Sequence, residues 1–398
     1  MGYLEDYNLL KDIYSLSNDS IKIPDTKIEI KNYSFVSDEN GYYPDSDYYN
    51  NCINKNLNII NNTFPNTESI LGKNDDDETC NKRFIYPLYH DSRKIKKLII
   101  LIHGLNESSW DKYNPWAKRL VELTGQAVLM FPISFHVNRK PQAWSASRSM
   151  NVLSKERKNN YESKESSFVN AALSTRLQFN PELFFWSGLR SFYDVQKLIE
   201  EIRNGSISEI DKDCRISFFG YSIGAFLIEN LIMARKELFS DSKIVLFCGG
   251  PTMDIMYPIS KYIYDSTAER VMTDFYVKNF ERNIQSDEYL KKYFADNEED
   301  GMVFRSLLNM DRHSGFRVNK LKDYEDRILA IPLTCDYVMP PDSVRKTLNE
   351  NGLKVRINEM NFPFDYDHIS PFPLGEKIKE ETNECFGKVL ANAAEWLD

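Results

Sequence analysis

Several features that mark familiar functional classes are absent from this sequence of 398 residues or rare in it. Acidic residues outnumber basic ones by 59 to 50, which argues against nucleic acid as the main partner because phosphate binding needs a basic face. The six cysteines show no paired spacing, so neither a disulfide framework nor a zinc site is indicated. We expect all of them to be reduced thiols, with the third, fourth and fifth buried: Cys52, Cys80, Cys214, Cys248, Cys335 and Cys385.

Long apolar runs are also missing. The best candidate for a membrane span, residues 216–233, is interrupted by Glu229 and Asn230. The first residues show neither a basic stretch nor an apolar one, so no signal peptide is predicted, and Asp6 stands where a myristoylation motif needs Ser or Thr. We therefore expect a cytoplasmic protein without stable membrane insertion. The sequence does not indicate its oligomeric state.

Patterns that hold metals and cofactors are absent as well. The five histidines never pair at i and i+4, and residues 75–77, three aspartates, lack the spaced ligands and the glycine of a calcium loop. Neither a glycine-rich phosphate loop nor a dinucleotide fingerprint occurs. The sequence therefore predicts a protein without metal or cofactor.

What the sequence does contain is an alternation of short apolar runs and amphipathic helical patterns. Residues 189–202 and 386–397 repeat apolar side chains at helical spacing, and Pro340-Pro341 opens a further helix. Apolar runs of this kind are typical of strands covered on both faces. The pattern predicts a doubly wound, mostly parallel α/β sheet. The expected strands are residues 83–88, 98–102, 127–131, 216–219, 243–247, 328–333 and 353–357.

The alternation also suggests how the chain is organised. Residues 1–80, with one alternating stretch near residues 27–30, form an N-terminal extension of unknown role, and residues 81–398 form the α/β domain. Two segments, residues 137–186 and 251–320, interrupt the alternation. Both leave the sheet at strand ends, where α/β enzymes place binding loops, so we expect them to form a cap.

The strongest chemical signal is Gly220-Tyr221-Ser222-Ile223-Gly224. It is a G-x-S-x-G motif that follows an apolar strand and precedes a helix, which is the context that gives this short pattern meaning. The turn needs glycine on both sides because the serine backbone is strained. It exposes the Ser222 hydroxyl above the sheet, so we expect Ser222 to be a nucleophile.

A second motif, Ile102-His103-Gly104-Leu105, follows the first central strand. With these two motifs the chain resembles the α/β-hydrolase superfamily over roughly residues 82–136 and 188–398. The resemblance implies an oxyanion hole formed by the backbone N–H groups of Leu105 and Ile223. It also implies that His103 is a structural residue.

The same superfamily places an acid and then a histidine after the serine. His368 lies beyond the last expected strand and is the expected base, while His313 lies inside the second insertion. Asp336 follows the strand at 328–333 and precedes a proline that opens a helix, so it is the expected acid. Asp254, one strand earlier, is the alternative acid.

The segment after residue 131 carries two further candidates. His136 and Arg139 leave the carboxyl end of a central strand, so they are candidate substrate-binding residues, and Arg139 suits a carboxylate or phosphate. The alternative for Arg139 is a salt bridge or a capping role.

Together these residues predict a serine hydrolase that cleaves a small-molecule carboxylic ester or thioester through an acyl-enzyme on Ser222. An amidase, a peptidase, an acyltransferase or an interfacial lipase would use the same triad. A catalytically silent scaffold that binds a ligand or a protein partner is the alternative from another class.

Overall fold

The computed structural model describes residues 2–38, 43, 79–91 and 94–398. Cys52 and the acidic run at 75–77 lie outside this part of the chain. One nine-stranded sheet runs through the molecule, in the order β1-β2-β3-β5-β4-β6-β7-β8-β9. The strands are β1 Ser20–Lys22, β2 Glu29–Val36, β3 Arg83–His90, β4 Ile95–Ile102, β5 Ala127–Phe131, β6 Ile210–Tyr221, β7 Ile244–Phe247, β8 Ile328–Ile331 and β9 Arg356–Ile357.

The sheet is mostly parallel. Each neighbouring pair from β5 through β4, β6, β7 and β8 to β9 is parallel, whereas β1, β2 and β3 form antiparallel pairs at one edge. The parallel strands all point the same way, so their carboxyl ends meet at a single edge. The predicted fold class is confirmed: the protein has an α/β fold built on a mostly parallel sheet.

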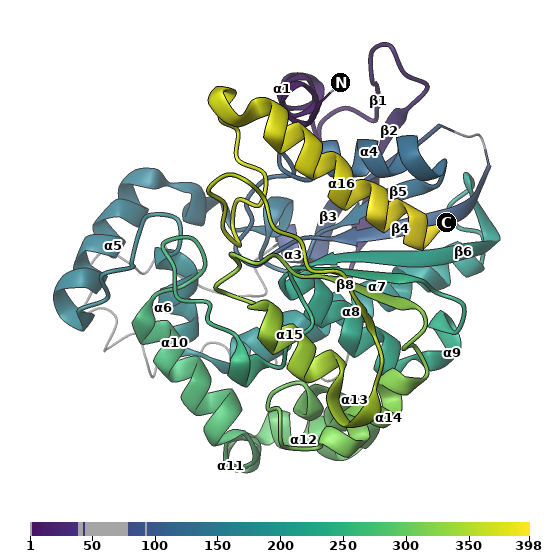
Figure 1. Cartoon of the computed structure of the whole chain (residues 1–398). Coiled ribbons are helices and arrows are strands. Elements are labelled where there is room, and N and C mark those ends of the chain that lie inside the picture. Colours follow the sequence, from purple (N-terminus) through teal and green to yellow (C-terminus); the bar gives the residue numbers. More distant parts are fainter. Residues whose placement is uncertain (1, 39–42, 44–78, 92–93) are drawn as a thin grey trace.

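Helices cover both faces of this sheet, as Figure 1 shows. One face carries α1 (Tyr3–Ile13), α4 (Asn114–Thr124) and α16 (Lys379–Leu397), which pack against one another. The other face carries six helices whose buried side chains share a second core. These are α7 (Glu182–Arg203), α8 (Ile223–Ala234), α9 (Lys236–Phe239), α13 (Glu298–Ser306), α14 (Ser314–Lys322) and α15 (Pro341–Leu348).

Strand β4 shows why this sequence forms a central strand. Its side chains alternate between the two cores: Ile100 and Ile102 join the α7–α8 side, whereas Ile99 and Leu101 join the α1–α4–α16 side. All four are fully buried. Because successive strand residues point to opposite faces, an unbroken apolar run is what a doubly covered strand requires.

The N-terminal segment shares this sheet with the rest of the chain. Strand β2 pairs with β3 along its whole length, from Glu29 opposite His90 to Val36 opposite Arg83. Helix α1 packs on α4 and α16. A short helix, α3 (Thr79–Lys82), leads into β3. The described part of the expected extension therefore belongs to the same structural unit as the α/β core.

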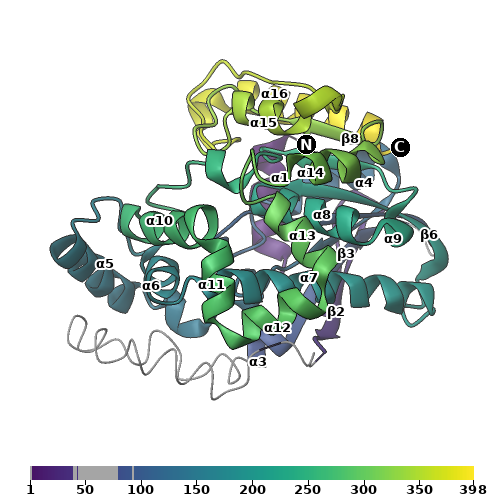
Figure 2. The same cartoon turned by 90° about the horizontal axis from the view of Figure 1, so that it is seen from below.

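The two insertions are helical, and α6 of the first packs against α10 of the second beyond the sheet, as Figures 1 and 2 show. The first contributes α5 (Ser147–Tyr161) and α6 (Ala171–Phe179). The second contributes α10 (Ser266–Met272), a π-helical stretch (Thr273–Lys278), α11 (Phe280–Ser286) and α12 (Glu288–Asp296), and then α13 and α14. Side chains from α6, α7 and α10 to α13 form a separate aromatic-rich core.

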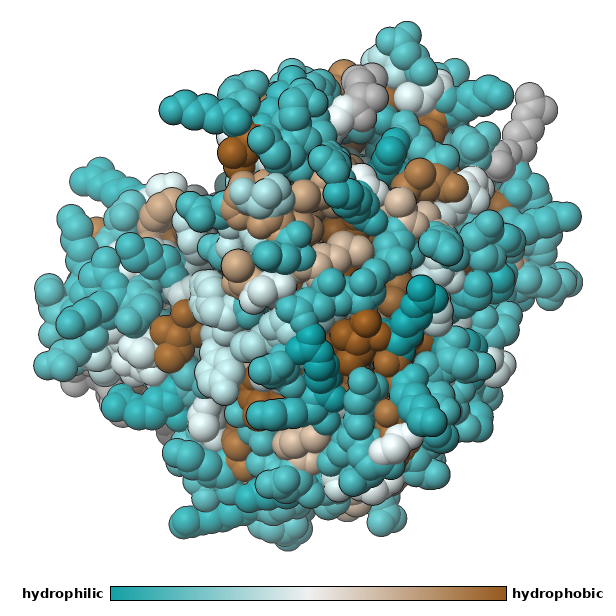
Figure 3. Space-filling view, in the orientation of Figure 1, coloured by the Kyte–Doolittle hydropathy of each residue, from teal (hydrophilic) through white to brown (hydrophobic). Residues whose placement is uncertain are grey.

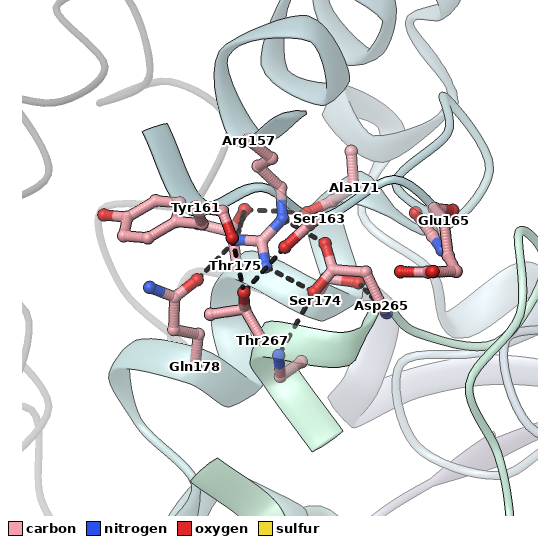
Figure 4. A network of polar contacts seen from close by, with 12 residues as sticks. Arg157, Tyr161, Ser163, Glu165, Ala171, Ser174, Thr175, Gln178, Asp265 and Thr267 are labelled. Atoms are coloured by element: carbon pink, nitrogen blue, oxygen red, sulfur yellow. Dashed lines mark hydrogen bonds and ion pairs between the residues drawn. The ribbon is translucent and has the colours of Figure 1, made fainter. Parts of the chain in front are cut away.

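A buried ion pair joins the two insertions (Figure 4). Arg157 on α5 binds Asp265, the residue that caps α10, through two bonds of 2.6 and 2.8 Å. A third guanidinium nitrogen donates to Thr175 and Gln178 on α6. Both members of the ion pair are fully buried. The guanidinium therefore fixes α10 relative to α5 and α6.

Hydrophilic side chains cover most of the face in Figure 3, with small separate hydrophobic areas near its centre. Within the described residues, every helix is too short or too polar to span a bilayer. The described cysteines that the structure reports as free thiols are Cys214, Cys248, Cys335 and Cys385. The expectation that Cys335 is buried is wrong: the chain has left the sheet there, and the side chain is exposed.

Candidate active site

The turn between β6 and α8 is strained at Ser222. This residue has φ 57° and ψ −119°, a backbone conformation that residues other than glycine rarely adopt. A Cβ atom on Gly220 would meet the Cα atom of Ala225 at 2.7 Å, and one on Gly224 would collide with the backbone carbonyls of Ile102 and His103. Both glycines of the motif are therefore required by the space around the turn.

Three side chains from separate loops meet at the carboxyl edge of the sheet. The Oγ atom of Ser222 lies 2.7 Å from Nε2 of His368, and Nδ1 of His368 lies 2.8 Å from Oδ2 of Asp336. All three are buried. Because an ionised carboxylate only accepts, Nδ1–H donates to Asp336, and the Nε2 lone pair faces the serine hydroxyl. This arrangement can remove a proton from Ser222.

The loop after β8 holds Asp336 in place. Its Oδ1 accepts hydrogen bonds from the backbone N–H groups of Val338, at 2.9 Å, and Met339, at 2.8 Å. The other oxygen is left for His368. These bonds fix the orientation of the carboxylate, and the carboxylate in turn fixes the orientation of the His368 ring.

The two alternative residues lie elsewhere. Asp254 accepts hydrogen bonds from the Thr252 hydroxyl, at 2.7 Å, and from the Met310 backbone N–H, at 3.0 Å. His313 is exposed in front of α14. The structure therefore brings Asp336 and His368 to Ser222. Asp254 and His313 contact none of these three residues within the described structure.

Two further residues surround His368 that the sequence reading did not single out. The Tyr221 hydroxyl donates to the carbonyl oxygen of His368, and the two rings stack at 5.6 Å between centroids. Lys112 Nζ lies 4.7 Å from the centre of the Tyr221 ring and donates to the Ile369 carbonyl at 3.3 Å. Tyr221 lies inside the G-x-S-x-G motif, so the sequence pointed to its position near Ser222. Lys112 lies in a loop that contains no recognisable motif.

The expected oxyanion hole has two free donors. Within the described part of the chain, neither Leu105 nor Ile223 uses its backbone N–H in a hydrogen bond. Ile223 is the first residue of α8, whose N–H groups have no partner inside the helix. Both residues line the cavities described below. A carbonyl oxygen near Ser222 Oγ could accept from these donors.

His103 fixes the loop that carries Leu105. Its Nε2 accepts from the Ile133 N–H at 3.0 Å, so Nδ1 carries the proton and donates to the Gly104 carbonyl at 2.8 Å. Complete burial lowers the pKa of His103 to about 3, which keeps the ring neutral. His103 thus links the ends of β4 and β5.

The two expected substrate-binding residues differ in their surroundings. Arg139 does not face a cavity: its guanidinium is fully buried, 2.8 Å from the carboxylate of Asp194, and also binds the Asn81 carbonyl. The salt bridge proposed as its alternative role is thus the one observed. His136 does line the larger cavity, with Nδ1 bonded to the Ser134 carbonyl at 2.8 Å. Burial lowers its pKa to about 3, so it carries no charge.

Among the described residues, one group of metal-ligand types is close enough to be considered for an ion: Cys248, Asp336 and His368. Two of them already bind each other. Burial and the neighbouring Asp336 carboxylate raise the pKa of the Cys248 thiol well above its usual range. Both ring nitrogens of His368 already have partners, Asp336 at Nδ1 and Ser222 at Nε2, so the described group offers no free imidazole nitrogen to an ion.

Two cavities adjoin at the turn between β6 and α8, called the elbow below. They share four lining residues, Leu105, Phe184, Ile223 and Phe226. The larger has a volume of about 100 Å³ and a mostly apolar lining from α7, α8 and α13. The smaller, about 40 Å³, contains Ser222 and is walled by the second insertion and the Asp336 loop. An acyl chain and a leaving group could therefore occupy separate spaces on either side of the serine.

The chain was compared with known proteins. The family described as "Family of unknown function (DUF6051)" matches residues 1–398. No curated protein sequence matches the chain. Among solved structures, carboxyl esterase 2 from the fungus Tuber melanosporum is 11% identical with a TM-score of 0.46, over 98% of this chain and 97% of that one.

Two other solved structures are similar to the chain at the same level. An esterase from Pyrobaculum calidifontis is 14% identical with a TM-score of 0.40, over 90% of this chain and 95% of that one. A cold-adapted esterase from an Arctic intertidal metagenomic library is 8% identical with a TM-score of 0.42, over 97% and 100%. Sequence identities of 8–14% and TM-scores of 0.40–0.46 do not carry the activity of these esterases over to this chain.

Proposed function

The chain belongs to the DUF6051 family of unknown function, and we propose that it is a serine hydrolase that cleaves carboxylic esters or thioesters. One observation carries this proposal: the unbroken chain of contacts from Ser222 through His368 to Asp336, beneath a strained turn. A serine hydroxyl is a weak nucleophile near neutral pH and needs such a base.

The reaction begins with proton transfer. His368 Nε2 takes the Ser222 proton as Oγ bonds to the carbonyl carbon of the substrate, and Asp336 stabilises the imidazolium. The carbonyl oxygen becomes an oxyanion that accepts from the Leu105 and Ile223 N–H groups. As the bond to the leaving group breaks, His368 returns the proton to the departing oxygen or sulfur. Water then attacks the acyl-enzyme by the same steps and releases the acid.

The cavities support an assignment of the two substrate halves. The leaving atom must lie near His368 to receive its proton, so the leaving half lies on the side of the Asp336 loop, in the smaller cavity. The acyl half then extends past the oxyanion donors into the larger cavity. The larger cavity, at about 100 Å³ against about 40 Å³, has the more extended apolar lining, so it suits the acyl chain.

A series of nitrophenyl esters tests the proposal. We expect turnover by the wild-type protein to rise from the acetate to acyl chains of roughly six to eight carbons and to fall beyond them. Ser222→Ala and His368→Ala should each lose most of this turnover and remain folded. A folded wild-type protein that turns over no ester in the series contradicts the proposal and favours a silent scaffold that binds a ligand or partner.

A further inference from the structure

The smaller cavity carries a charged residue that the proposed mechanism does not use. Glu269 lies on α10 and lines the same space as Ser222. The other lining side chains are apolar or uncharged, among them Met253, Met256 and Tyr264. A single carboxyl group therefore faces a space that is otherwise suited to carbon.

Glu269 has hydroxyl partners and no cation. The Thr273 hydroxyl donates to its Oε1 at 2.7 Å, and the nearby Tyr264 hydroxyl also favours the charged form of the carboxyl group. Within the described residues, Glu269 forms no ion pair. Its partial burial raises the pKa of the carboxyl group, because the charged form has lost part of its water. Partly buried carboxylates are normally paired with a positive charge, and none of the described residues supplies one to Glu269.

The position of Glu269 is fixed by the rest of the cap. Asp265 begins α10, accepts from the Ala268 N–H at 3.1 Å, and is held by Arg157 (Figure 4). Glu269 follows one turn later and bonds to Thr273 at the start of the π-helical stretch. The carboxyl group thus stands on a rigid element and can act as a fixed recognition group.

We propose that the smaller cavity binds an alkylammonium group carried by the leaving half of the substrate, with Glu269 as the residue that recognises its charge. This inference rests on the proposed ester hydrolysis. A cation beside Glu269 supplies the missing countercharge, and the aromatic and thioether side chains around it contact alkylammonium groups favourably. The substrate class is therefore an ester or thioester of an amino alcohol or an amino thiol.

Two esters of identical acyl group test the inference. Choline butanoate and 3,3-dimethylbutyl butanoate have the same shape and differ by one positive charge. We expect the wild-type protein to hydrolyse the choline ester with a kcat/KM about tenfold above that of the neutral ester. Glu269→Gln should bring this ratio close to one. Because the ratio compares two substrates of one preparation, a loss of folded enzyme cancels.

Asp274→Asn is the matched control, since it removes an exposed carboxylate five residues further along. It should leave the ratio and both rates unchanged. A ratio near one in the wild-type protein overturns the inference, and so does an equal preference in wild type and Glu269→Gln. A ratio that falls as much in Asp274→Asn also overturns it, because a general surface field would then be the cause.

A binding measurement separates this inference from the proposed function. Tetramethylammonium chloride is titrated calorimetrically into Ser222→Ala protein, with and without Glu269→Gln. Saturable binding that needs Glu269 supports the cation site even where no ester is hydrolysed, in which case the hydrolase proposal alone fails. Ester turnover without any cation binding or charge preference overturns the inference and leaves the hydrolase proposal standing.

Discussion

Oδ2 of Asp336 lies 2.8 Å from Nδ1 of His368, and Oδ1 of the same carboxylate accepts two backbone N–H groups. This relationship assigns the acid of the proposed triad. We expect Asp336→Asn to lower kcat roughly 10³- to 10⁴-fold, because the amide no longer favours the imidazole tautomer that can accept the serine proton.

Asp254→Asn provides the comparison within the same chain, since Asp254 bonds to Thr252 and Met310 and, among the described residues, to neither Ser222 nor His368. Its kcat should stay within a few-fold of wild type when both variants are measured with the same nitrophenyl ester. A large loss in Asp254→Asn together with a mild one in Asp336→Asn would reverse the assignment.

Gly224→Ala should disable the elbow through sterics alone. The added methyl group would collide with the backbone carbonyls of Ile102, the last residue of β4, and of His103, which follows it; backbone atoms cannot rotate away as a side chain can. We expect the free energy of unfolding to fall by roughly 1–3 kcal/mol and turnover to fall much further, since the elbow and the oxyanion donors both shift. Urea unfolding and ester turnover measure the two effects.

Gly387→Ala is the control for this substitution. Gly387 lies within α16, and a Cβ atom there would meet nothing within 4 Å. Alanine is a better helix former, so the variant should gain roughly 0.5–1 kcal/mol and keep full turnover. Equal losses in both variants would show that the effect at Gly224 is not steric.

Glu229 predicts a pH dependence of stability. It is a fully buried residue of α8, and neither of its carboxyl oxygens is hydrogen-bonded within the described structure. Burial raises its pKa to about 8 from an ordinary value of 4.5. Between these values the folded state holds a proton that the unfolded state has released. The free energy of unfolding should therefore fall as pH rises from about 5 to 8, by up to roughly 1.4 kcal/mol per pH unit from this group.

Glu229→Gln should remove that decline, because an amide does not titrate. Urea unfolding of wild type and variant at pH 5.5, 7 and 8.5 gives the difference between the two curves, in which other titrating groups cancel. We expect the free energy of unfolding of the variant, relative to that of the wild type, to increase steadily up to pH 8. A difference that does not change with pH would mean that Glu229 is ionised in the folded protein throughout.

Replacing one member of the ion pair between Arg157 and Asp265 should strongly destabilise the protein. Arg157→Met leaves a buried carboxylate without its partner and should cost roughly 3–5 kcal/mol of unfolding free energy. Combining it with Asp265→Asn, which keeps a side-chain acceptor for the Ala268 N–H, should recover part of this loss. Urea unfolding of both single variants and the double variant measures it, and additive losses would mean that the residues are not coupled.

Much of the sheet could be predicted from the sequence, for a physical reason. A strand covered on both faces must be apolar throughout, so runs such as Ala127–Phe131 are visible without any tertiary information. The first β-strands were harder to predict: β2 (Glu29–Val36) is an antiparallel strand near the edge of the sheet, and only two of its eight residues, Ile30 and Phe35, are buried. Its membership of the sheet depends on pairing with β3, which is a tertiary fact.

The site was predictable where a motif carries geometry. The glycines around Ser222 and the order of the loops after it led to residues that the structure brings together. Arg139 was not predictable in this way, because a charged residue at a strand end can face a cleft or, as here, pair with Asp194 inside the protein. Glu269 could not be found either, since only folding places a helix of the second insertion beside Ser222.

The central claim is that Ser222 is an activated nucleophile, and covalent labelling tests it most directly. Wild type, Ser222→Ala and His368→Ala are treated with a fluorophosphonate probe, and the adduct is located by mass spectrometry of peptides. We expect one adduct in the wild type, on Ser222, none in Ser222→Ala and strongly slowed labelling in His368→Ala. A folded wild-type protein that stays unlabelled, or an adduct on another residue, would contradict it.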